Sequence, residues 1–142
     1  MVKSFINFVF VACLLLGGCS IGLSDNSLSY LTPEGVSILL KEGAGTFLDA
    51  DAEVVIVDPR PTWSYDQGHI PGAVNIPFGQ LNVLVWKLED AGVIVVAGET
   101  HEDSVAIAMS KRLIKLGFSN VKTLRGGLTG WEDAGHEVVT AE

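Results

Sequence analysis

The six residues from Gly98 to Asp103 carry the side chains of this chain whose types and spacing could do chemistry. Their sequence is Gly-Glu-Thr-His-Glu-Asp, which places three carboxylates and one imidazole within a short segment. The segment follows an apolar run, 93–97, and precedes a helical apolar pattern that starts at Val105. Unpaired backbone N–H groups converge where such a helix begins, so α/β proteins often bind anions and place catalytic groups there. This segment, however, contains no cysteine, lysine or arginine that could act as a nucleophile or pair with an anion.

The same loop also has a cation-binding interpretation. Glu99, His101, Glu102 and Asp103 are hard ligands of the type that hold divalent metals. Neighbouring loop residues usually point apart, so we favour an acidic, solvated loop in which Asp103 or Ser104 caps the following helix. No metal and no cofactor is therefore expected, and a cation site stays the weaker alternative.

Strands alternating with helices must position this loop. Strands are predicted over 53–57, 74–76, 93–97 and 121–124, and helices over 33–42, 62–66, 80–89, 105–116 and a last segment that contains Trp131. Thr32 and Pro33 form a helix start, and Gly43 and Gly117 form helix ends. In the helix after the loop, the spacing predicts a buried face of Val105, Ala108, Met109, Leu113 and Leu116. The alternation predicts an α/β domain with a largely parallel sheet.

Composition limits the partners of this domain. The chain has 142 residues, and its nine basic and seventeen acidic residues give a net charge of −8. A chain of this length forms one domain. Its acidic balance makes a nucleic acid an unsuitable partner.

The N-terminus reads as a targeting segment. Lys3 precedes an apolar stretch of about a dozen residues, which is shorter than the ~20 residues of a membrane-spanning helix. The sequence Leu16-Gly17-Gly18-Cys19 then resembles a bacterial lipobox, which implies cleavage before Cys19 and lipid on that cysteine. We predict a signal peptide over 1–18, a lipidated tether over 19–30 and a folded domain over 31–142. Plain secretory cleavage and an uncleaved anchor are the alternatives.

Processing at this site would remove Cys13 and leave Cys19 carrying lipid. The mature chain would then have no free thiol and no internal disulfide. The predicted location is the cell envelope, at the periplasmic face of the outer membrane if the host is Gram-negative.

Two segments resemble the rhodanese-like domain family. The first is Val57-Asp58-Pro59-Arg60 with Gly68-His69-Ile70-Pro71-Gly72-Ala73, and the second is Leu124-Arg125-Gly126-Gly127 with Trp131. The resemblance covers about 31–139 and implies the rhodanese α/β sandwich, a mostly parallel central sheet with helices on both faces. In the sulfurtransferases of that family, the central strand leads into a loop of the type Cys-x-x-Gly-x-Arg, whose cysteine carries sulfur as a persulfide.

Aligned on Ser104, the resemblance puts Gly98 at the cysteine, His101 at the glycine and Asp103 at the arginine. A shift of one residue would put Ala97 at the cysteine, and neither residue has a thiol. The loop equivalent to the active-site loop is therefore Gly98, Glu99, Thr100, His101, Glu102 and Asp103. Its three carboxylates should repel an anionic sulfur donor by more than the helix dipole attracts it.

The supporting residues have structural roles in this interpretation. Asp58 and Arg60 are expected to brace the loops, and His69 to be a hydrogen-bonded scaffold residue. Gly126 and Gly127 are expected to serve a turn. The three tryptophans, Trp63, Trp86 and Trp131, are expected to fill the core or cover helix edges.

These features predict a membrane-anchored rhodanese-like domain without sulfurtransferase activity, which binds an unknown protein or small molecule. The alternative is a thiosulfate or persulfide sulfurtransferase that uses an unrecognised thiol.

Overall fold

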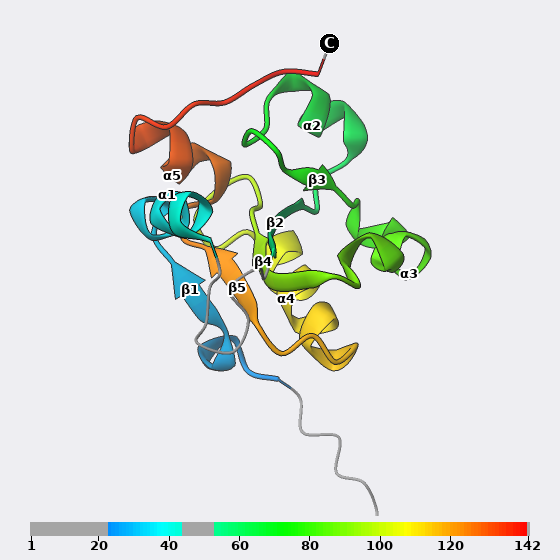
Figure 1. Cartoon of the computed structure of the whole chain (residues 1–142). Coiled ribbons are helices and arrows are strands. Elements are labelled where there is room, and N and C mark those ends of the chain that lie inside the picture. The colour runs from blue at the N-terminus through cyan, green and yellow to red at the C-terminus, as the bar shows by residue number, and fades with distance from the viewer. Residues whose placement is uncertain (1–22, 44–52, 142) are drawn as a thin grey trace, which may run out of the picture.

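The computed structural model describes residues 23–43 and 53–141. Its centre is a five-stranded sheet in the order β1-β5-β4-β2-β3, formed by β1 (Ser29–Leu31), β2 (Glu53–Asp58), β3 (Val74–Asn75), β4 (Ala91–Val96) and β5 (Val121–Leu124). Every pairing between neighbouring strands is parallel, so all five carboxyl ends lie at one edge (Figure 1). The predicted parallel α/β architecture is confirmed.

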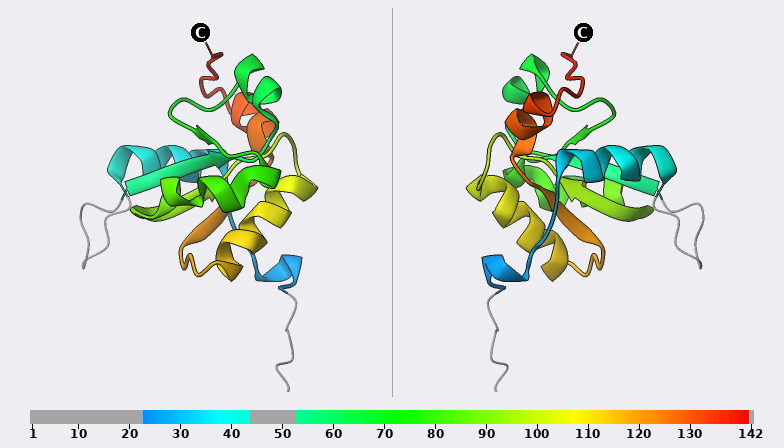
Figure 2. Two further views of the ribbon diagram at one scale, coloured as in Figure 1. Left: turned by 90° about the vertical axis from the view of Figure 1, so that its right-hand side faces the viewer. Right: turned by 90° about the vertical axis from the view of Figure 1, so that its left-hand side faces the viewer.

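Helices cover both faces of this sheet (Figures 1 and 2). One face packs against α1 (Pro33–Glu42) and α5 (Gly127–Asp133), and the other against α3 (Leu81–Leu84) and α4 (Ser104–Lys115). Along β4, Val93 and Val95 belong to the first core cluster, whereas Ile94 and Val96 belong to the second. This period of two explains why the strand reads as an uninterrupted apolar run: both of its faces are buried.

The predicted helix boundaries agree with the structure in most places. Thr32 caps α1 by accepting the backbone N–H of Gly35, Pro33 is its first residue and Gly43 follows its end. The short helix α2 (Thr62–Gln67) also forms as predicted. The predicted helix over 80–89 is wrong as a continuous element. It divides into the 3₁₀ turn η2 (Phe78–Gln80), one turn of α3 and the 3₁₀ turn η3 (Val85–Leu88).

The predicted buried face of α4 is only partly correct. Met109 and Leu113 are buried, but Val105 and Leu116 are exposed, and Ala106 and Ser110 take their places in the interior. On this face Ser110 shares a hydrogen bond with Thr123 of β5, with 2.8 Å between the hydroxyl oxygens. The apolar periodicity of the sequence does not show a buried pair of hydroxyl groups on two different elements, so it could not predict this face.

The segment before α1 is part of the fold, which corrects the predicted tether. Residues Asp25–Ser27 form the 3₁₀ turn η1, Leu28 is buried, and β1 pairs with β5. The described part of the predicted tether, 23–30, is thus largely folded, and the remainder lies outside the described residues. The predicted signal peptide and Cys19 also lie outside the described residues.

Of the two roles predicted for the tryptophans, filling the core holds for Trp131 alone. Trp131 is buried and its indole N–H donates to the carbonyl of Glu137 at 2.8 Å. Trp63 and Trp86 are 66% and 60% exposed, so they do not fill the core. In the described parts of the chain, no helix is long and apolar enough to cross a membrane.

Candidate functional site

The loop Gly98–Asp103 connects β4 to α4 at the carboxyl edge of the sheet, as the sequence predicts. Asp103 is the N-cap of α4, and one carboxylate oxygen accepts the backbone N–H groups of Val105 and Ala106 at 2.8 and 3.2 Å. The other oxygen accepts the N–H of Glu99 at 2.7 Å. Three converging amides are thus occupied by a carboxylate of the protein itself.

This carboxylate also fills the space beside Gly98. A Cβ atom built on Gly98 would lie 2.6 Å from Oδ2 of Asp103 and 2.8 Å from the Cβ of Ala106. Both distances are below the 3.0 Å that real Cβ atoms keep. A side chain of any kind at position 98 would therefore collide with its surroundings unless both Asp103 and Ala106 moved.

Arg60 holds the loop from the side of β2. The buried guanidinium bonds to both carboxylate oxygens of Asp58, to the carbonyl of Gly68 and to Oε2 of Glu99, the last at 2.6 Å. Burial by itself would lower the pKa of Arg60, but its hydrogen bonds with Asp58 and Glu99 and their negative charges raise the pKa above its ordinary value. Arg60 therefore stays charged, and the bracing role predicted for Asp58 and Arg60 matches this geometry.

Arg60 also changes how the three loop carboxylates act. From the sequence alone, Glu99, Glu102 and Asp103 are expected to repel an anion equally. In the structure Glu99 is paired with Arg60, and Asp103 is bonded to backbone N–H groups. The carboxylate of Glu102 is 83% exposed, with His101 4.0 Å away. Because Asp103 occupies the amides at the start of α4, the predicted disadvantage for an anion at these amides depends on this occupancy more than on the summed charge of the three carboxylates.

The backbone of the loop is held from the side of α5. Leu128 and Thr129 donate their N–H groups to the carbonyls of Gly98 and Glu99 at 2.8 and 3.0 Å. Gly127 lies in the left-handed region with φ of 59°, and a Cβ there would lie 2.6 Å from the oxygen of Gly98. The glycine predicted for a turn is thus also needed for close contact with the loop.

His69 is a scaffold residue, as predicted. Its ring stacks on Tyr65 with 3.7 Å between the centroids, and its Nδ1 lies 2.9 Å from the carbonyl oxygen of Tyr65. The hydroxyl of Tyr65 in turn donates to the carbonyl of Ala73 at 2.7 Å. These contacts fasten the Gly/Pro-rich loop 68–73.

The cation interpretation gains no support from the geometry. Within 23–43 and 53–141, no group of three or more His, Cys, Asp or Glu side chains is placed to hold a metal ion. Of its four candidate ligands, Glu99 and Asp103 are engaged elsewhere, and His101 and Glu102 extend into solvent.

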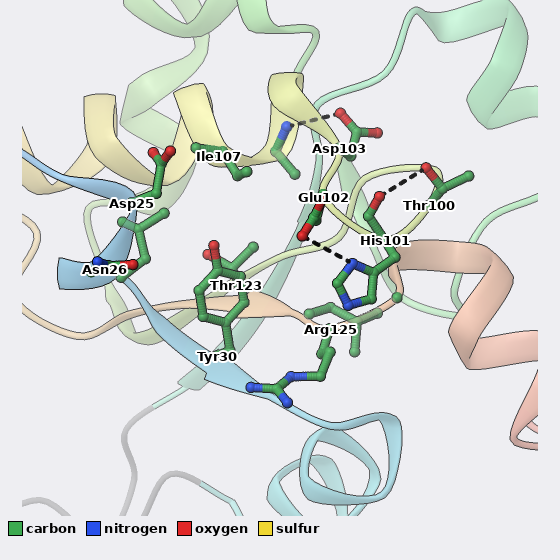
Figure 3. Close-up of a pocket in the computed structure, with 14 residues that line it drawn as sticks. Asp25, Asn26, Tyr30, Thr100, His101, Glu102, Asp103, Ile107, Thr123 and Arg125 are labelled. Carbon is green, nitrogen blue, oxygen red and sulfur yellow. Dashed lines mark hydrogen bonds and ion pairs between the residues drawn. The ribbon is translucent and has the colours of Figure 1, made fainter.

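Sequence reasoning missed two contacts and two residues of the site. It did not anticipate that Asp103 reaches back to the N–H of Glu99, or that Glu99 pairs with Arg60 across 39 positions. It also did not single out Tyr30 or Arg125, which lie beside the loop (Figure 3). An unpaired basic residue at the end of a strand is a signal that could have found Arg125.

Comparison with known proteins gives one family. A family model described as the rhodanese-like domain matches residues 46–134. The thiosulfate sulfurtransferase GlpE of Pseudoalteromonas translucida is 32% identical over 88 residues, covering 61% of this chain and 81% of that protein. The adenylyltransferase and sulfurtransferase UBA4 of Saccharomyces cerevisiae is 33% identical over 87 residues, but this chain spans only 19% of its length.

Solved structures agree. A thiosulfate sulfurtransferase from Pseudomonas aeruginosa superposes with a TM-score of 0.66 at 27% identity, covering 83% of this chain and 21% of that one. The Alr3790 protein from Anabaena superposes with a TM-score of 0.65 at 26% identity, covering 78% and 80% of the two chains.

Proposed function

Because the chain belongs to the rhodanese-like domain family, we propose that it is a member without sulfurtransferase activity, which acts as a binding or regulatory module in the cell envelope. One observation carries the proposal. The carboxylate of Asp103 occupies the amides at the start of α4 and the space beside Gly98, where the family resemblance places the reactive cysteine.

Sulfur transfer needs a thiolate that attacks, holds and releases sulfur. The chain has two cysteines, Cys13 and Cys19, and both precede the described fold. Cleavage before Cys19 would remove the first, and lipid would block the sulfur of the second. A retained scaffold with an altered, exposed loop is suited to recognition, since rigid elements position such loops for binding.

A thiocyanate assay tests the absence of activity. The mature chain, purified from membranes in detergent, is mixed with thiosulfate and cyanide beside a rhodanese that has its cysteine. We expect no thiocyanate above the buffer blank from this chain. Turnover comparable to that of the control enzyme would refute the proposal.

The alternative function, a thiosulfate or persulfide sulfurtransferase, is favoured by the names of the relatives. Its thiol would have to be Cys19, unlipidated and folded back onto the loop. Cys19→Ser separates the two functions in the same assay, because it abolishes any turnover that depends on this thiol and changes nothing if the chain is inactive.

The membrane anchor is tested by the mass of the mature protein. We expect a mass that corresponds to a chain starting at Cys19 with lipid attached, and we expect Cys19→Ser to release the protein from the membrane fraction. An unmodified chain that starts at another residue would remove the lipoprotein part of the proposal and leave the assay above unaffected.

A further inference from the structure

A groove of about 920 Å³ runs along α4, between residues 25–30 and the loop Gly98–Asp103 (Figure 3). Four segments line it: residues 25–30, the loop residues 100–103, the first turns of α4 and the end of β5 at 123–126. Its volume lies within the range of small-molecule sites, roughly 300–1,000 Å³. Half of its lining residues lie in the segments 25–30 and 123–125, which have no part in the proposed function described above.

The floor of the groove has its polar groups satisfied. Leu28, Ala106 and Leu124 are buried apolar residues that contribute to it. The hydroxyl of Thr123, which also belongs to the floor, already bonds to Ser110. An apolar body can therefore lie on this floor without leaving a buried donor or acceptor unpaired.

Most charges along the walls are already compensated. Asp25 forms an ion pair with Lys111, and Asp103 is bonded to three backbone N–H groups. His101 and Glu102 lie 4.0 Å apart and are largely exposed. None of these four groups therefore supplies a positive charge at a fixed position that could bind an anion.

Arg125 differs from them. Its guanidinium lies over the ring of Tyr30, 5.9 Å from the centroid. Within 23–43 and 53–141 it forms no ion pair and no side-chain hydrogen bond, and Figure 3 shows it beside the groove. A cation–π contact with an aromatic ring orients a guanidinium while leaving its N–H donors exposed, and these donors match a carboxylate in a two-point contact.

We propose that the groove binds a small organic carboxylate with an apolar or aromatic body. The carboxylate contacts Arg125, and the body lies against Tyr30 and Ile107 over the apolar floor. A singly charged group is favoured over a dianion because Glu102 lies on the same wall and repels a second negative charge. The inference deepens the proposed function by naming the ligand class of the module.

The test compares an acid with its uncharged analogue. The mature chain is titrated by equilibrium dialysis with N-acetyl-L-phenylalanine and with N-acetyl-L-phenylalaninamide. We expect the acid to bind at least ten-fold more tightly than the amide. Equal affinities, or no binding of either at 10 mM (roughly the weak limit of small-ligand recognition), would overturn the inference.

Matched variants locate the contact. Arg125→Gln is expected to abolish the preference for the acid, and Tyr30→Ala to weaken binding of the acid. Lys122→Gln removes the same charge three residues before Arg125, in β5, where the ammonium bonds to Ser29, and should leave the preference intact. A preference that persists in Arg125→Gln, or is lost equally in Lys122→Gln, would overturn the assignment.

Two further probes identify the source of the carboxylate. A pentapeptide ending in phenylalanine is titrated with a free and with an amidated C-terminus. Ten-fold tighter binding of the free peptide than of N-acetyl-L-phenylalanine supports a polypeptide C-terminus as the source, whereas equal binding supports a free metabolite. Tighter binding of phenyl phosphate than of the acid would contradict the preference for one charge. Because no arm measures sulfur transfer, failure here leaves the thiocyanate result standing.

Discussion

At the scale of single residues, the decisive pair is Gly98 and Asp103. A glycine at the end of β4 supplies no nucleophile, and an aspartate five positions later uses the amides that would otherwise face an incoming anion. The two residues fit each other, since Asp103 has room only because position 98 lacks a side chain. Introducing a cysteine at position 98 without also changing Asp103 should therefore not give sulfurtransferase activity.

We predict that Gly98→Cys gives no sulfurtransferase activity and lowers the free energy of unfolding. The new Cβ would lie 2.6 Å from Oδ2 of Asp103, and overpacking of this kind costs about 1–3 kcal/mol. Urea denaturation and the thiocyanate assay measure the two effects. Strong thiocyanate formation by this variant would show that Asp103 and the loop charges do not block the chemistry.

A double-mutant cycle isolates the collision itself. In an Asp103→Gly background, Gly98→Cys should cost less stability than in the natural chain, because the 2.6 Å contact is gone while that with Ala106 remains. Identical costs in both backgrounds would mean that Asp103 does not occupy this space.

The two ion pairs of Arg60, with the buried Asp58 and with the half-exposed Glu99, should differ in how much they stabilise the fold. Arg60→Ala leaves the carboxylate of Asp58 buried and unpaired, which typically costs about 3–5 kcal/mol. Glu99→Gln removes a partner whose side chain is 52% exposed, so solvent screening should keep its cost below about 1 kcal/mol. Denaturation midpoints measure both, and a loss for Glu99→Gln as large as that for Arg60→Ala would contradict this ranking.

At the scale of elements, the loop is held between β2 and α5. Arg60 follows β2 and forms an ion pair with Glu99, while the backbone N–H groups of Leu128 and Thr129 in α5 donate to the carbonyls of Gly98 and Glu99. The loop is thus anchored on both sides at Gly98 and Glu99, and the side chains of His101 and Glu102 are exposed at its tip. An exposed tip on an anchored loop suits a recognition surface.

Two glycines test the contact between α5 and the loop. Gly127 and Gly135 both have positive φ, but a Cβ on Gly127 would lie 2.6 Å from the oxygen of Gly98, whereas one on Gly135 would meet nothing within 4 Å. We predict that Gly127→Ala destabilises the domain by about 1–3 kcal/mol more than Gly135→Ala, because only the first adds a steric collision to the backbone strain. Thermal or urea unfolding measures the difference, and equal losses would indicate strain alone.

At the scale of the whole molecule, the parallel sheet separates the N-terminus from the loop. The chain enters β1 at the amino edge of the sheet, and the loop lies at the carboxyl edge (Figure 1). From Cys19 to Asp25 the chain can span at most about 20 Å. If Cys19 carries lipid, the amino edge lies close to the membrane and the loop faces away from it.

Fluorophores at the two edges check this orientation. The mature chain has no free thiol if Cys19 is lipidated, so Thr100→Cys labels the loop and Ser119→Cys labels the segment just before β5. In lipid vesicles that contain an acceptor dye, we predict more energy transfer from position 119 than from position 100. Equal transfer would mean that the domain lies on its side or is not held by its N-terminus.

The sequence by itself determined the resemblance to the family, most of the order of strands and helices from α1 onward, and the lack of a thiol in the folded domain. These depend on local periodicity, caps and residue identity, as the start of α1 at Thr32 and Pro33 shows. Only the tertiary structure decided that Asp103 bonds back to Glu99, that residues 25–31 belong to the fold, and that Arg125 lies over Tyr30 beside a groove. Each of these depends on how the chain folds around it, through a backbone turn or a contact between distant segments, and periodicity carries no information about such contacts.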